Sequence, residues 1–560
     1  MNSRPTDAFT YRRRPTVAVA VGNTVIGGGN PVRIQSMAST PTMDTEASVA
    51  QCLSIAAAGA ELVRFTAQGV REAANLTAIR DGVRAAGCDV PLVADIHFNP
   101  RAAFESVGRV EKIRINPGNF IDPGRTFRAL EYTDEEYGRE LRRLEDAFVP
   151  LLEKCEATGT ALRIGVNHGS LSDRIMSRYG DTPAGMAESA MEFLRVCKRR
   201  GFDNVVISIK ASNVCVMVQT VRMLVRAMDK EDMHYPLHLG VTEAGDAEDG
   251  RIKSAVGIGS LLASGIGDTI RVSLCEPPEN EVPVARMITD YIASFESAGT
   301  IEGCLAEGYD EVAPERCESD EVDGIGGRNC NLVAVREASS SGADISLDRV
   351  KARIVEIDAS LPQNEWPQIN HDDIILLGTE APDYPGHMKA ALHSMKNAGM
   401  KNPVILKASY RGISKDEVTV RASIDLGSLL LAGFGDGIMV ESDLMPEKEC
   451  VNLAFGILQA TRRRFTRTEY IACPGCGRTM FDLQDTLRRV KEGTSHLKGL
   501  KIGVMGCIVN GPGEMADADY GYVGAGAGRV SLYRGKECVM KNISSDQAVE
   551  RLLELIENDR

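Results

Sequence analysis

The sequence lacks a long apolar run, an excess of basic residues and any density of aromatic side chains. No stretch reaches the roughly 18 uninterrupted apolar residues that a membrane-spanning helix needs, so we expect no membrane association. Lys and Arg number 64 against 78 Asp and Glu, and the net charge of −14 disfavours binding to nucleic acid. No apolar segment follows the arginines at positions 12–14, so we expect no secretory signal and a cytoplasmic location.

A disulfide framework is also not expected, although the chain contains 14 cysteines. Without a secretory signal the surroundings are reducing, and cysteines then serve as buried small side chains, metal ligands or redox groups. Most of them stand alone within apolar stretches, as buried cysteines do. Only Cys473 and Cys476 form a closely spaced pair, which indicates metal or redox chemistry in the last part of the chain.

Short β-rich segments alternate with helical segments through the first half of the chain, a pattern typical of parallel α/β structure. Eight βα units within roughly 250 residues predict a TIM barrel. A doubly wound sheet is the alternative, but the glycine fingerprint of its first turn is absent. The eight predicted strands are Val32–Met37, Glu61–Phe65, Pro91–Phe98, Val110–Pro117, Ala161–Asn167, Asn204–Lys210, Pro236–Ala244 and Asp268–Leu274.

Polar residues recur within these predicted strands, many of them near the strand ends. A spacing of two positions, as between Asp95 and His97, places both side chains on one face of a strand. Late positions in barrel strands lie near the catalytic mouth. The alternative is that single strands end in polar residues where they reach solvent, but six strands contribute here, which favours one shared site. The other residues in this set are Arg114, Asn116, Arg163, Asn167, Lys210, Glu243, Arg271 and Ser273.

The middle of the chain contains a partial repeat of the predicted barrel. The segments Gly259–Glu281 and Gly427–Glu449 align without a gap and share 12 of 23 residues. A shorter match aligns Lys210–Ser212 with Lys407–Ser409. Chance similarity of a common βα unit is the alternative to a true repeat. We interpret the middle segment as a second, incomplete copy of the barrel.

The second copy lacks polar residues that the first copy carries. Arg271 and Ser273 are replaced by Met439 and Glu441, while the glycines and leucines are kept. We therefore predict a structural role for this insert, joined to the barrel by the acidic linker Glu307–Asp323. The predicted domains are a TIM barrel at residues 1–296, a barrel-like insert at 297–465 and a C-terminal α+β domain at 466–560.

Three cysteines in the last segment have the setting of metal ligands. The turn from Cys473 to Cys476 directs two thiolates toward one centre. Cys507 lies among glycines that let the backbone approach a ligand closely. The spacing fits a [4Fe–4S] cluster held by three thiolates, with the fourth iron left open or bound by a weak oxygen ligand.

Structural zinc is the alternative, and it needs a fourth nitrogen or sulfur ligand. His496 is isolated, and neither Cys450 nor Cys538 has a glycine-rich setting. Glu514 follows Cys507 across a Gly-Pro-Gly turn and is the natural oxygen donor to a cluster. The spacing therefore favours a cluster over zinc.

Six motifs together resemble the 4-hydroxy-3-methylbut-2-enyl diphosphate synthase family of iron–sulfur enzymes. They are IQSMAST (Ile34–Thr40), VADIHFN (Val93–Asn99), KIRINPGN (Lys112–Asn119), RIGVNHGSL (Arg163–Leu171), CPGCGR (Cys473–Arg478) and GCIVNGPGE (Gly506–Glu514). The resemblance covers the first 280 residues and the last 100 in order. The middle is similar to the extra barrel-like domain of the three-domain form found in plants and some bacteria.

The resemblance implies a [4Fe–4S] cluster held by Cys473, Cys476, Cys507 and Glu514, with Asn510 close to the substrate. It also implies the reaction, which is reductive ring opening and dehydration of 2-C-methyl-D-erythritol 2,4-cyclodiphosphate. The product is 4-hydroxy-3-methylbut-2-enyl diphosphate, in the methylerythritol phosphate route to isoprenoids. Reduced ferredoxin or flavodoxin is the implied electron donor.

A diphosphate needs several fixed cations, and arginine grips phosphate oxygens through two parallel N–H groups. Glu243 is our candidate proton donor, with partnership in a salt bridge as the alternative. Asp95, Asn116 and Asn167 are expected to position the carbon skeleton. The expected substrate-binding residues are Arg64, Arg114, Arg163, Lys210 and Arg271, with Ser273 and His97 as hydrogen-bond partners.

Two other functions compete with this one. A non-catalytic metal or electron-transfer module on a barrel would explain the cysteines but leave the cationic residues without a purpose. A pterin-type TIM-barrel enzyme with a structural zinc tail is the second. The resemblance implies a cytoplasmic bacterial enzyme. It leaves open whether the barrel and the cluster domain meet across a homodimer or within one chain.

Overall fold

The computed structural model describes residues 8–122, 130–245, 247–508, 513, 515 and 517–559. The chain forms two compact units, each built from segments that are separate in sequence. The first unit comprises Met1–Arg13, Arg251–Ile266 and Met287–Thr466, and the second comprises Arg14–Gly250, Gly267–Arg286 and Arg467–Arg560. Among the described helices, none is long and apolar enough to cross a membrane.

The second unit contains an eight-stranded parallel barrel, which confirms the predicted TIM barrel. The strands are hydrogen-bonded in chain order, and β10 pairs with β3. A single bridge between Ile207 and Leu237 joins β8 to β9 and closes the ring. The strands are β3 (Arg33–Met37), β4 (Leu62–Ala67), β5 (Leu92–Ile96), β6 (Lys112–Ile115), β7 (Ala161–Asn167), β8 (Val205–Lys210), β9 (His238–Leu239) and β10 (Thr269–Ile270).

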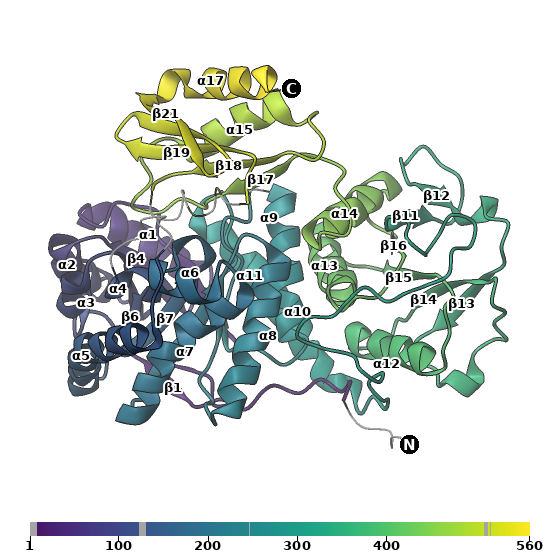
Figure 1. Ribbon diagram of the computed structural model, residues 1–560, viewed down its shortest axis with the longest axis horizontal. Coiled ribbons are helices and arrows are strands. Elements are labelled where there is room, and N and C mark those ends of the chain that lie inside the picture. Colours follow the sequence, from purple (N-terminus) through teal and green to yellow (C-terminus); the bar gives the residue numbers. More distant parts are fainter. Residues whose placement is uncertain are drawn as a thin grey trace. The chain divides into compact units, whose positions relative to one another are not determined.

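Helices follow the barrel strands, as the alternation in the sequence predicts (Figure 1). A capping box between Thr133 and Glu136 starts α5, and Gly159 ends it in the left-handed conformation at φ 68°. These helices are α1 (Thr45–Ala57), α2 (Val70–Ala85), α3 (Pro100–Ser106), α4 (Pro117–Phe120), α5 (Asp134–Thr158), α6 (Asp173–Tyr179), α7 (Pro183–Arg200), α8 (Val214–Lys230), α9 (Ala247–Ser254) and α11 (Glu281–Ser294).

A short hairpin closes the amino-terminal end of the barrel. Its strands β1 (Val19–Val21) and β2 (Thr24–Ile26) pair in antiparallel fashion. Val19, Val21 and Ile26 are fully buried and form one cluster with apolar side chains of the first inward-facing layer, including Leu62 and Val93. This plug leaves the carboxyl-terminal end of the barrel as the end available for a polar site.

The first unit contains a six-stranded parallel sheet formed by the insert, which confirms the predicted partial barrel. Its strand order is β12-β11-β16-β15-β14-β13. The strands are β11 (Leu332–Val335), β12 (Ile345–Ser346), β13 (Ile354–Asp358), β14 (Ile374–Gly378), β15 (Val404–Tyr410) and β16 (Gly437–Ser442). Its helices are α12 (Tyr384–Asn397), α13 (Lys415–Leu431) and α14 (Glu447–Ala460).

The insert repeats a hydrogen bond between a strand N–H and an aspartate side chain that the last barrel strands contain. In the barrel, Leu237 N–H donates to Asp268 Oδ2 over 3.0 Å. In the insert, Val404 N–H donates to Asp436 Oδ2 over 3.0 Å. The strand β15 is therefore the counterpart of β9, and β16 is the counterpart of β10.

The shorter match in the sequence, which aligned Lys210 with Lys407, is wrong in the structure. Lys210 ends β8, two strands before β10, whereas Lys407 lies on β15, which pairs directly with β16. Ile207 N–H donates to Pro236 O in the barrel, and the equivalent bond in the insert joins Ile375 to Pro403. Gly378 therefore occupies the place of Lys210.

The helical parts of the two repeats, both within the first unit, pack against each other through equivalent residues. Ser428 of α13 donates a hydrogen bond to Ser260 over 3.2 Å, and these serines align in the repeat. A Cβ atom on Gly259 would collide with Ile424, and one on Gly427 would press against Val256. Val256 and Ile424 also align, so the contact is reciprocal. Both glycines are kept because the helix backbones approach closely here.

The C-terminal part of the second unit is an α+β domain, as predicted. Three strands run parallel and the last two are antiparallel to their neighbours. The helices α15 and α17 pack together on the sheet, with Val504, Tyr522 and Leu552 in the shared core (Figure 1). The elements are β17 (Glu469–Ala472), α15 (Leu483–Thr494), β18 (Lys501–Met505), β19 (Tyr520–Gly526), β20 (Arg529–Arg534), β21 (Glu537–Ser544) and α17 (Ser545–Asn558).

Candidate active site

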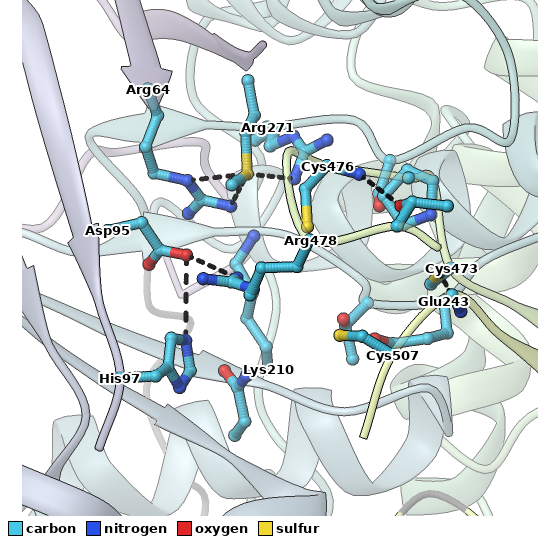
Figure 2. A pocket seen from close by; sticks show the side chains of 18 of the residues that line it. Arg64, Asp95, His97, Lys210, Glu243, Arg271, Cys473, Cys476, Arg478 and Cys507 are labelled. Carbon is cyan, nitrogen blue, oxygen red and sulfur yellow. Dashed lines mark hydrogen bonds and ion pairs between the residues drawn. The ribbon is translucent and has the colours of Figure 1, made fainter. Parts of the chain in front are cut away.

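A cavity of about 80 Å³ in the second unit is lined by the carboxyl ends of the barrel strands and by the cysteine loops (Figure 2). The barrel supplies most of the polar residues that the sequence indicated. The cysteine loops after β17 and β18 supply the three predicted thiols. The predicted residues that line this cavity are Arg64, Asp95, His97, Arg114, Arg163, Asn167, Lys210, Glu243, Arg271, Ser273, Cys473, Cys476 and Cys507.

One further predicted residue that the structure describes, Asn116, does not line this cavity. Asn116 caps the short helix α4 by accepting from Gly118 N–H and donates to Ser170 Oγ over 2.7 Å. It is buried beside the cavity without lining it. Asn510 and Glu514 lie outside the residues that the structure describes.

Asp95 lies at the centre of the hydrogen-bond network in the cavity. Its Oδ1 accepts from Arg114 Nη1 over 2.9 Å, and its Oδ2 accepts from Arg478 Nη2 over 3.0 Å. Burial raises the pKa of this carboxyl, but the surrounding cations, Arg64 first, hold it well below its usual value. Asp95 is therefore a permanent anion that fixes the guanidinium groups around it.

Arg114 connects three strands of the barrel. Besides Asp95, it contacts His97, and its Nη2 donates to Gly165 O over 2.7 Å and to Asn167 Oδ1 over 3.1 Å. Burial lowers the pKa of His97, and the positive charge of Arg114 lowers it further. His97 is thus neutral and available as a hydrogen-bond partner.

The remaining cations give the cavity an unbalanced positive charge. Burial and the nearby Arg64 and other guanidinium groups lower the pKa of Lys210 and of Arg163. Within the described residues, Arg163 Nε and Nη1 have no hydrogen-bond partner. Arg271 pairs with a carboxylate of its own, that of Glu281, over 2.9 Å. An anionic ligand would supply the missing partners and relieve the repulsion among these groups.

Arg478 is a cavity residue that the sequence reasoning did not select. It lies two residues after Cys476, is largely buried, and reaches Asp95 of the barrel. Burial lowers its pKa, but Cys476 and Asp95 raise it above the ordinary value. Its Nε and Nη1 have no hydrogen-bond partner among the described residues. The available signal was the motif CPGCGR, in which an arginine stands two residues after the second predicted ligand.

Glu243 is held in a conformation that is rare for a residue with a side chain. Its φ is 49°, in the left-handed region, and such backbone strain is commonly found at functional sites. The next residue, Ala244, forms a parallel bridge with Ala472, which directly precedes Cys473. The carboxylate is close enough to Cys473 to raise the pKa of that thiol, after burial as the main cause (Figure 2). The bridge thus brings a barrel carboxylate to the cysteine loops.

The three thiols share this cavity but do not converge on a single ion. Among the described residues, no three His, Cys, Asp or Glu side chains lie where they could hold one metal ion. A zinc ion binds sulfur at about 2.3 Å and needs such convergence, whereas thiolates around a multi-iron cluster lie further apart. Gly506 N–H donates to Cys473 Sγ over 3.2 Å, a kind of contact that tunes iron–sulfur sites. The three thiols nevertheless line one cavity in the second unit.

A TIM barrel that gathers so many buried cations at its carboxyl end defines an enzyme for a small anionic substrate. Two family models match this chain, described as the GcpE TIM-barrel domain over residues 16–286 and the GcpE protein C-terminal domain over residues 469–558. The chain belongs to the GcpE family, the 4-hydroxy-3-methylbut-2-en-1-yl diphosphate synthases.

Relatives match along nearly the whole chain. A protein of Parabacteroides distasonis is 52% identical over 98% of this chain and 99% of its own length. One of Phocaeicola vulgatus is 50% identical over 98% of both chains, and one of Porphyromonas gingivalis is 49% identical over 99% of both. Each is named 4-hydroxy-3-methylbut-2-en-1-yl diphosphate synthase (flavodoxin). The alternative of a non-catalytic electron-transfer module is therefore not supported.

Proposed function

We propose that this enzyme reduces 2-C-methyl-D-erythritol 2,4-cyclodiphosphate to 4-hydroxy-3-methylbut-2-enyl diphosphate. The reaction opens the cyclic diphosphate, releases a hydroxyl group as water and consumes two electrons. The supporting observation is the single cavity in which buried barrel cations and three thiols meet. The names of the full-length relatives describe the same product.

The diphosphate binds, in this proposal, to the cations at the carboxyl end of the barrel. Guanidinium groups can grip phosphate oxygens through paired N–H groups, and Arg163 has such groups without a protein partner in the described structure. His97, neutral at pH 7, and Ser273 complete the hydrogen bonds to the phosphates. The proposed binding residues are Arg64, Arg114, Arg163, Lys210 and Arg271.

We assign the thiols of Cys473, Cys476 and Cys507 to a [4Fe–4S] cluster, with Glu514 as the fourth, weak ligand. Such a cluster supplies single electrons and a Lewis-acidic iron when bound, which no protein side chain can do. The chain contributes a partly buried setting, since Cys473 packs against the core of the C-terminal sheet and Gly506 N–H contacts its sulfur. Asn510 is assigned a place near the substrate from the family resemblance.

Glu243 is assigned the proton for the departing hydroxyl group. It lines the same cavity as the barrel cations and is close to Cys473, so it can reach a group that departs within this cavity. Asp95 holds Arg114 and Arg478 in place and, with Asn167 and Asn116, keeps the carbon skeleton oriented. The same packing excludes water from reactive species.

The electron donor in this proposal is reduced flavodoxin, because the relatives are named flavodoxin-dependent. Ferredoxin, the other donor that the resemblance implies, is the alternative. The three-domain division at residues 1–296, 297–465 and 466–560 also stays a proposal. The two compact units differ from this division, because residues 251–266 and 287–296 of the proposed barrel domain group with the insert.

The assignment is tested by electron paramagnetic resonance on anaerobically purified enzyme, reduced with dithionite. We expect a brown protein with an iron–sulfur signal that changes when the cyclodiphosphate is added, and turnover to the open-chain diphosphate. A colourless protein with stoichiometric zinc would contradict the cluster. An iron–sulfur signal that does not change when the substrate is added, together with no turnover, would contradict the proposed reaction but not the proposed cluster.

A mixing experiment tests whether one chain makes a complete site. Every described residue that lines the cavity belongs to the second unit of one chain. We therefore expect a mixture of Arg163→Ala and Cys476→Ser proteins to stay inactive, even after long incubation. Recovery of activity toward one quarter of the wild-type value would instead indicate that barrel and cysteine domain meet across a dimer.

A further inference from the structure

A second cavity, in the first unit, lies at the carboxyl ends of strands β14 and β15 of the insert. Its volume is about 340 Å³, within the range of small-molecule sites. The loop Thr379–Tyr384 and the end of β15 form one wall, and α13 and Tyr291 form the other. Nothing in the proposed reaction uses this cavity.

The position of this cavity in the insert repeats that of the catalytic cavity in the barrel. Because β15 is the counterpart of β9, Tyr410 occupies the place of Glu243, and Gly378 occupies the place of Lys210. In α/β folds, ligands bind at the carboxyl ends of parallel strands. The insert therefore keeps a cavity at the ligand-binding edge while its lining chemistry has changed.

Asp425, on helix α13, is the central polar group of this second cavity. Its carboxylate is 1% exposed and accepts from Tyr291 Oη over 2.8 Å and from Tyr410 Oη over 2.7 Å. Burial raises the pKa of Asp425 to about 7, although Tyr410, Tyr291 and Arg421 act in the opposite direction. Among the described residues, tyrosine hydroxyls are thus the hydrogen-bond partners of this buried carboxyl group.

A second carboxyl group, that of Asp383, lies in the loop that lines the same cavity. Asp383 has a φ of 57°, accepts from Gly386 N–H over 3.0 Å and starts helix α12. Burial raises the pKa of Asp383 to about 6, even with Lys389 of α12 nearby. Two buried carboxyl groups that line one cavity favour a positively charged ligand.

The cations that line this cavity are engaged with other groups. Arg421 stacks over the Tyr291 ring at 5.0 Å and pairs with Glu417 over 3.3 Å. Arg411 is exposed and lies 3.9 Å from Glu380. Three tyrosines, at positions 291, 384 and 410, add aromatic rings to the wall. Carboxylates together with tyrosine rings are the chemistry that binds ammonium groups.

We propose that the insert binds a small organic ammonium compound in this cavity, with Asp425 and Asp383 as its charge partners. A phosphorylated or other anionic ligand would instead face two carboxylates. The insert, which the sequence indicated as purely structural, then has a ligand site of its own. The site is independent of the proposed reaction, so either proposal can fail without the other.

Calorimetric titration of the full-length protein tests this site. At pH 8 we expect saturable binding of 1,4-diaminobutane and no comparable binding of 1,4-butanediol, which matches its length without charge. Ionised carboxyls bind the cation, so affinity falls as the pH drops through about 7 and 6, by at least tenfold between pH 8 and pH 5. The groups that face Asp425 during this titration are Tyr291, Tyr384, Asp383, Tyr410 and Arg421.

Substitutions of the two cavity carboxylates test whether the diamine binds in this cavity. Asp425→Asn should weaken diamine binding at least tenfold, while Asp372→Asn, an exposed carboxylate of the insert, should leave it unchanged. Asp383→Asn provides a second test if the first variant does not fold, as judged by circular dichroism. Absence of diamine binding, equal binding of the diol or of inorganic pyrophosphate, or unchanged affinity in both cavity variants would overturn the proposal.

Discussion

Glu243→Gln is expected to lower kcat by about 10²–10⁴-fold, the usual contribution of a positioned general acid. Glutamine keeps the size of the side chain and can still accept and donate hydrogen bonds, but it has no proton of suitable acidity. The strained backbone at φ 49° is fixed by residues around it, so the amide should occupy the same place. KM for the cyclodiphosphate should change little, because the diphosphate contacts are made by other residues.

Steady-state kinetics with dithionite-reduced enzyme measure this effect, and electron paramagnetic resonance spectra show whether the proposed cluster is intact. Glu248→Gln is the matched control, since Glu248 is exposed and only five residues further along. A salt-bridge role for Glu243 makes a different prediction: a loss of stability with kcat nearly unchanged. That result would remove Glu243 from the catalytic assignment.

Arg478→Lys is expected to lower kcat/KM by about 10²–10³-fold. Removing one partner of a buried, hydrogen-bonded charge pair costs about 2–5 kcal/mol, and 1.36 kcal/mol corresponds to a tenfold change in rate. In Arg478 the planar guanidinium group donates to Asp95 over 3.0 Å, and two further nitrogens have no hydrogen-bond partner among the described residues. Lysine keeps the charge but has no such planar group. Both KM and kcat should change, because the guanidinium connects the two halves of the cavity.

A double-mutant cycle with Asp95→Asn distinguishes this role from a general loss of packing. The Asp95 substitution should cost less in the Arg478→Lys background than in the wild-type protein, because the pair is already broken. Arg488→Lys, an exposed arginine of helix α15, serves as the control. Additive effects of the two substitutions would show that the ion pair between barrel and cysteine domain has no role in turnover.

The barrel could be predicted from the sequence because its signals are local. Each strand is a short β-rich run bounded by turn residues, and all eight predicted strands overlap strands of the barrel. The polar residues could be predicted for the same reason, since strand periodicity and strand ends fix their direction. Only Asn116 deviates, because helix α4 starts there and uses its side chain as a cap.

The contacts across the fold could not be predicted in the same way. The motif CPGCGR places Arg478 beside the predicted ligands, but nothing local shows that it reaches a buried carboxylate 383 residues away in sequence. The misplaced match of Lys210 with Lys407 has a similar cause. The three-residue match Lys-Ala-Ser carries no information on strand order. The hydrogen bonds to Asp268 and Asp436 show which strands correspond.

The reciprocal contact between Ser260 and Ser428 affects which amino-acid substitutions the two repeats can accept. Isologous subunit interfaces are made by identical copies, so each substitution appears on both sides at once. Here the two sides are encoded separately and held on one chain, so the contact does not depend on protein concentration. One copy can therefore vary while the other is held constant. This asymmetry allows cations at one set of strand ends and carboxyls with tyrosines at the other.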